Sequence, residues 1–132
     1  MSRPRRNRWF VLSCVAIVIA LGLGSRHAVM PDFVKTYAGD FLWGVLFFAL
    51  GAYLWPTCAT VRLWCGAVAV TEGIEGSRLW RPAWLEHLRT TAVGGLLLGH
   101  GFSWSDVVCV AAGATAAALL DALESGALRR MA

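Results

Sequence analysis

Four long apolar segments dominate this sequence, at residues 9–25, 32–55, 58–77 and 104–123. An α-helix rises about 1.5 Å per residue, so roughly 20 residues cross a hydrocarbon core of about 30 Å. A chain in lipid must satisfy its own backbone hydrogen bonds, which a helix does within one segment. Each segment is therefore predicted to be a transmembrane helix.

Composition supports the same class. Of the 132 residues, 58% are hydrophobic and only 15% are charged, which is too apolar for an ordinary soluble domain. The chain is also too short for two domains. We predict one all-α transmembrane domain, residues 1–132, built as a bundle of four helices.

The connection between the third and fourth segments contains an amphipathic stretch and a glycine-rich stretch, neither long enough to span a membrane. Pro82 can open a short helix with Trp84, Leu85 and Leu88 on one side, which predicts an amphipathic helix at the membrane interface. The following stretch, 90–102, is glycine-rich and too short to span. It is predicted to be a re-entrant or surface loop.

Small residues at a spacing of four mark the last segment. Gly113 and Ala117 would let another helix approach closely, so this helix is expected at the centre of the bundle. The same pair is a candidate contact for a partner helix.

Basic residues flank the apolar segments at both ends of the chain. Beside membrane helices, arginines mark the cytoplasmic side and touch anionic lipid, so no nucleic-acid partner is expected. Four spans and an uncleaved first helix then place both termini in the cytoplasm. The four cysteines lack metal-ligand spacing and are interpreted as packing residues, and no metal or cofactor is expected.

Ionisable residues gather at the opposite membrane face in this topology. A charged group in the hydrocarbon layer costs roughly 2.5–3.5 kcal/mol, so several together suggest a function. Glu72 and Glu75 are three residues apart and share one helical face. The candidate binding residues are Arg26, Asp40, Glu72, Glu75, Arg89, His100, Trp104 and Asp106.

Three interpretations of this cluster stay open. It binds the headgroup of an envelope component, with Arg26 and Arg89 holding an anionic group. Alternatively, the charges only pair the helices. In the third, Glu72 and Glu75 act as acid and base in an intramembrane enzyme, although no recognisable nucleophile or metal motif supports catalysis, and we assign no catalytic residue.

Several short motifs resemble one family of small bacterial membrane proteins, domain of unknown function 2809, itself distantly similar to VanZ-like proteins. The motifs are Gly24-Ser25-Arg26, Tyr37-Ala38-Gly39-Asp40, Ile74-Glu75-Gly76-Ser77, Leu88-Arg89-Thr90-Thr91 and Leu98-Gly99-His100-Gly101-Phe102-Ser103-Trp104-Ser105-Asp106. The likeness runs from about residue 8 to residue 121.

The resemblance implies a location in the bacterial inner membrane. Carried over by residue, it singles out Arg26, Asp40, Glu75, Arg89, Trp104 and Asp106. The family tends to have Gln where this chain has Arg78, which puts a charge in place of a neutral partner. The expected ligand is a cell-envelope lipid, a lipid-linked envelope component or a peptidoglycan-related headgroup.

Overall fold

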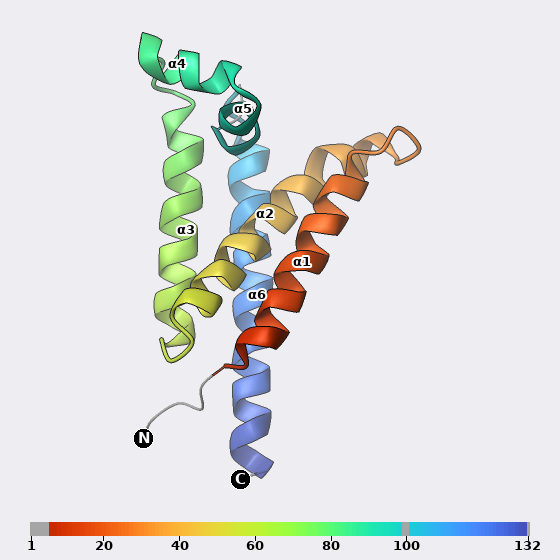
Figure 1. The fold of residues 1–132 in the computed structure, drawn as a ribbon, viewed down its shortest axis with the longest axis vertical. Coiled ribbons are helices and arrows are strands. Elements are labelled where there is room, and N and C mark those ends of the chain that lie inside the picture. The colour runs from red at the N-terminus through yellow and green to blue at the C-terminus, as the bar shows by residue number, and fades with distance from the viewer. Residues whose placement is uncertain (1–5, 99–100, 132) are drawn as a thin grey trace.

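The computed structural model describes residues 6–98 and 101–131, and these residues form helices joined by turns (Figure 1). The helices are α1 (Arg8–Ser25), α2 (Asp32–Leu54), α3 (Thr60–Ser77), α4 (Ala83–Thr90), α5 (Ala92–Leu98) and α6 (Trp104–Met131). The predicted all-α class is confirmed for the described residues.

Helices α1, α2 and α6 are long and apolar enough to cross a membrane. Helix α3 has 18 residues but carries Arg62, Glu72 and Glu75, which lower its mean hydropathy. The described structure therefore supports a membrane protein with three such helices, whereas four spans stay a prediction.

Local chemistry sets the helix ends. The Asn7 side chain accepts the backbone N–H of Trp9 and caps α1. Helix α2 begins directly after Pro31, with Asp32 in its first turn near the positive end of the helix dipole. It ends at Leu54, and the turn containing Pro56 leads into α3.

Helix α2 has the most neighbours in the described structure. It packs against α1, α3 and α6 and crosses α6 at a steep angle (Figure 1). Among the described helices, α6 contacts α2 and α3, whereas α1 contacts α2 alone. The helix predicted to be central, α6, thus shares that position with α2.

Glycines allow the close crossing of α2 and α6. A Cβ atom at Gly44 would collide with the carbonyl oxygen of Val110, and one at Gly113 would collide with that of Phe41. Gly113 thus gives the close helix approach predicted for it, and here α2 of the same chain covers it. The adjoining core contains Val11, Phe48, Ala52, Leu63, Ala67 and Ala114.

The segment between α3 and α6 differs partly from expectation. Helix α4 forms as predicted, with Leu85 and Arg89 buried and Trp84 exposed. Residues 92–98, predicted to be a loop, instead form α5. The Thr91 hydroxyl accepts the backbone N–H of Gly94 in the first turn, and Gly94 lies directly against the Leu88 carbonyl, so glycine here permits tight packing of two short helices.

Candidate functional site

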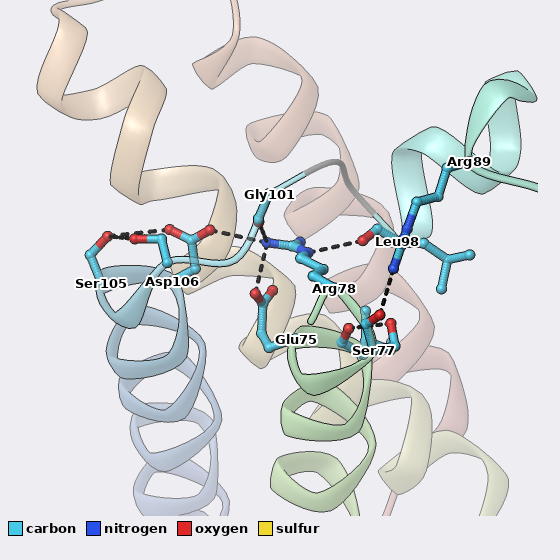
Figure 2. A network of polar contacts seen from close by, with 10 residues as sticks. Glu75, Ser77, Arg78, Arg89, Leu98, Gly101, Ser105 and Asp106 are labelled. Atoms are coloured by element: carbon cyan, nitrogen blue, oxygen red, sulfur yellow. Dashed lines mark hydrogen bonds and ion pairs between the residues drawn. The ribbon is translucent and has the colours of Figure 1, made fainter. Parts of the chain in front are cut away.

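The end of α3 and the start of α6 lie at the same end of the helix bundle, next to α4 and α5 (Figure 1). Arg78, just after α3, lies at the centre of the polar contacts there (Figure 2). Its Nε donates to the Leu98 carbonyl at 2.9 Å and its Nη1 to the Gly101 carbonyl at 3.1 Å. Arg78 therefore holds Leu98, at the end of α5, and Gly101, shortly before α6, against the end of α3.

Two carboxylates from different helices face the same guanidinium. Arg78 Nη1 lies 3.1 Å from Asp106 Oδ2, in hydrogen-bond geometry, and 2.7 Å from Glu75 Oε2. The contact with Glu75 is an ion pair without hydrogen-bond alignment. Only 2% of the Glu75 side chain is exposed, so this charge depends on Arg78 for compensation.

Asp40 joins the group from α2. Its carboxyl lies near enough to that of Asp106 for their charges to interact, and it also feels the positive charges of Arg78 and Arg26. Asp106 is also linked to the Ser105 hydroxyl, at 3.3 Å. Three helices thus contribute Asp40, Glu75 and Asp106 to one cluster around Arg78, which we call the acidic cluster.

Arg89, a predicted member of the site, lies apart from the acidic cluster. Its side chain is 2% exposed, and its guanidinium binds Glu86 Oε1 at 2.5 Å and the Ser77 carbonyl at 2.6 Å. Its Nε is buried without a hydrogen-bond partner among the described residues. Arg89 therefore joins α4 to the end of α3 (Figure 2).

The remaining predicted residues vary in position. Trp104 is 74% exposed and packs edge-on against Phe102, with ring centroids 5.1 Å apart. Arg26 is exposed and reaches the acidic cluster only through its charge on Asp40. Glu72 is half-buried, and its Oε1 has no hydrogen-bond partner in the described structure. His100 lies outside the described residues.

A family model described as a protein of unknown function (DUF2809) matches residues 29–114. The chain belongs to the DUF2809 family. The match to DUF2809 runs from the α1–α2 connection into α6, so it includes the acidic cluster and Arg78 but not Arg26. No solved structure matches the chain.

The charge balance limits what this DUF2809 protein can bind at the acidic cluster. Asp40, Glu75 and Asp106 contribute carboxyl groups and Glu72 lies near Glu75, whereas among the described residues the cation in contact with the cluster is Arg78, through Glu75 and Asp106. Such a set offers mainly acceptors, which suit hydroxyl, amine or ammonium groups. Among the described residues, no group of three or more potential ligands is arranged to hold a metal ion.

A second polar cluster, which the sequence patterns did not indicate, lies at the opposite end of the bundle. Arg6 binds both oxygens of Asp121, at 2.5 and 2.6 Å, and donates to the carbonyl oxygens of Pro56 and Cys58. The Thr60 hydroxyl also donates to Asp121, at 2.5 Å. Asp121, an acidic residue within a mainly apolar stretch of α6, was the available signal, but its partner lies 115 positions away in the sequence.

Proposed function

We propose that this DUF2809 protein is a bacterial inner-membrane protein with four spans, in which α3 is the fourth membrane-crossing helix and both termini are cytoplasmic. We further propose that the acidic cluster binds the headgroup of an envelope lipid or a peptidoglycan-related molecule. Convergence of Asp40, Glu75 and Asp106 from three helices carries this proposal.

The excess of carboxyl groups in the acidic cluster favours the hydroxyl and amine groups of such a headgroup over its phosphate. Hydroxyl and amine groups donate hydrogen bonds to carboxylates, whereas a phosphate would be repelled by them. Arg89, expected to hold an anion, is already engaged by Glu86 and the Ser77 carbonyl. A sugar or amine-bearing headgroup therefore suits the acidic cluster better than a phosphate.

A structural function is the second candidate. Arg78 makes contacts with α5, α6, Glu75 and the chain before α6, so it already satisfies much of the buried charge within the protein. In that case the acidic cluster fixes how α2, α3 and α6 pack, and no ligand is required.

Mass spectrometry of co-purified lipids separates these functions. We expect wild-type protein to retain an amine- or hydroxyl-bearing envelope lipid that Asp40→Asn and Glu75→Gln lose. Glu124→Gln is the matched control, because Glu124 is exposed near the far end of α6. If all four proteins carry the same lipids while Asp40→Asn and Glu75→Gln melt at lower temperature, the structural function is correct.

A further inference from the structure

A groove of about 170 Å³ lies between the start of α1 and the end of α2, far along the bundle from the acidic cluster. Arg8, Trp9 and Leu12 of α1 and Tyr53 of α2 line it. We propose that this groove binds the headgroup of an anionic phospholipid. The proposal is independent of the function proposed for the acidic cluster.

Arg8 supplies the charge that an anionic headgroup requires. Its guanidinium carbon lies 5.7 Å from the centre of the Tyr53 ring, a cation–π contact that places it beside the groove. Among the described residues Arg8 has no carboxylate partner, and it is exposed. The neighbouring Arg6 differs, because both Asp121 oxygens bind it. Arg8 is therefore available to bind a phosphate.

The other lining residues suit the parts of a lipid next to its phosphate. Trp9 is 78% exposed, and tryptophan is favoured at the level of the headgroups. Leu12 and the exposed apolar side chains farther along α1, including Ile19 and Leu23, provide a surface for an acyl chain. Since pockets for drug-sized ligands measure roughly 300–1,000 Å³, this groove of about 170 Å³ has room for a headgroup and not for a whole lipid.

Charge at this end of the bundle favours an anionic over a zwitterionic lipid. Arg62, at the start of α3, is exposed there as well, whereas Asp121 is bound by Arg6. Basic residues at a membrane surface attract anionic lipid. A guanidinium adds directed hydrogen bonds to phosphate oxygens, which distinguishes a site from diffuse attraction.

Native mass spectrometry with short-chain phosphatidylglycerol and phosphatidylcholine tests the proposal. We expect Arg8→Gln to weaken phosphatidylglycerol binding about tenfold, the factor for one lost charge-assisted hydrogen bond. Arg62→Gln removes the same charge at the same end but outside the groove, and we expect it to weaken phosphatidylglycerol binding clearly less than Arg8→Gln does. Phosphatidylcholine carries the same phosphodiester beside a cationic choline, so it should bind more weakly than phosphatidylglycerol to wild type and should lose less affinity on Arg8→Gln.

Three results would overturn the proposal. Equal losses in Arg8→Gln and Arg62→Gln would mean diffuse attraction to a basic surface, and no loss in either would mean that Arg8 binds no lipid. Glycerol phosphate, which lacks acyl chains, provides the third comparison. If it stabilises the protein against heat as well as phosphatidylglycerol does, the groove binds free phosphate esters instead of lipid.

Discussion

Individual side chains join parts of this chain that are far apart in sequence. Arg6 and Asp121 form a bidentate ion pair, and their side chains are only 11% and 13% exposed. Loss of one partner leaves a poorly solvated charge on the other, and breaking a buried pair in this way is strongly destabilising. The pair therefore fixes the chain just before α1 and the α2–α3 turn to α6.

We predict that Arg6→Gln or Asp121→Asn lowers the free energy of unfolding by about 3 kcal/mol, the scale for removing one partner of a buried ion pair. Reversible unfolding in detergent micelles measures the change. Glu124→Gln, one turn farther along α6 and exposed, should change stability by less than about 0.5 kcal/mol.

The double variant is the decisive comparison. If Arg6 and Asp121 act as a pair, Arg6→Gln combined with Asp121→Asn costs clearly less than the sum of the single changes. Strict additivity would show that the two residues stabilise the protein through separate contacts.

At the scale of the helices, the crossing of α2 and α6 depends on the absence of two side chains. Gly44 and Gly113 lie against backbone atoms of the opposite helix, which cannot move aside as a flexible side chain can. The two helices can therefore approach closely only while both positions are glycine.

We predict that Gly44→Ala and Gly113→Ala each destabilise the protein by about 1–3 kcal/mol, the usual cost of overpacking. Thermal unfolding in micelles is the measurement. Gly39, also in α2, is the matched control, because a Cβ atom added there would have no neighbour within 4 Å. Gly39→Ala should be neutral or stabilise by up to about 1 kcal/mol through helix propensity, so equal destabilisation by all three substitutions would contradict the close-crossing explanation.

Helix α4 is attached to α3 through one buried guanidinium. We predict that Arg89→Gln releases α4, because the Ser77 carbonyl and Glu86 lose their shared partner. Amide exchange in α4 should become at least about tenfold faster, while exchange in α2 stays unchanged. Arg81→Gln is the control, because the 3.8 Å contact between Arg81 and Glu86 is exposed. If amide exchange in α4 became equally fast in both variants, Arg89 would not be the residue that attaches α4 to α3.

At the scale of the whole molecule, the proposed topology places the two inter-helix turns around α2 on opposite sides of the membrane. We predict that in a cysteine-free background Val29→Cys reacts with an impermeant thiol reagent in intact cells, whereas Thr57→Cys reacts only after permeabilisation. Both positions are exposed in turns. Reversed labelling would invert the orientation, and labelling of both from outside would show that α2 does not span.

Most helix positions could be predicted from the sequence, but only part of the candidate site could be. Apolar runs ending near Pro31 and Pro56 predicted helix boundaries within a few residues of those observed. Because consecutive helices run in opposite directions, the sequence also predicted that Asp40 and Asp106 lie at the same end of the bundle. It did not show that Arg78 forms the centre of the acidic cluster, or that Arg89 faces the end of α3.

The sequence by itself determined that the chain forms helices, several of them long and apolar enough to cross a membrane, because a long apolar segment in lipid must satisfy its backbone hydrogen bonds within itself, whatever its neighbours are. It also predicted that Glu75 and Asp106, which both contact Arg78, lie at the same end of the bundle. Only the tertiary structure decided the partners of Arg6, Arg78 and Arg89 and the close crossing at Gly44 and Gly113. Those depend on helix rotation and crossing angle, which arise from packing between segments distant in the chain.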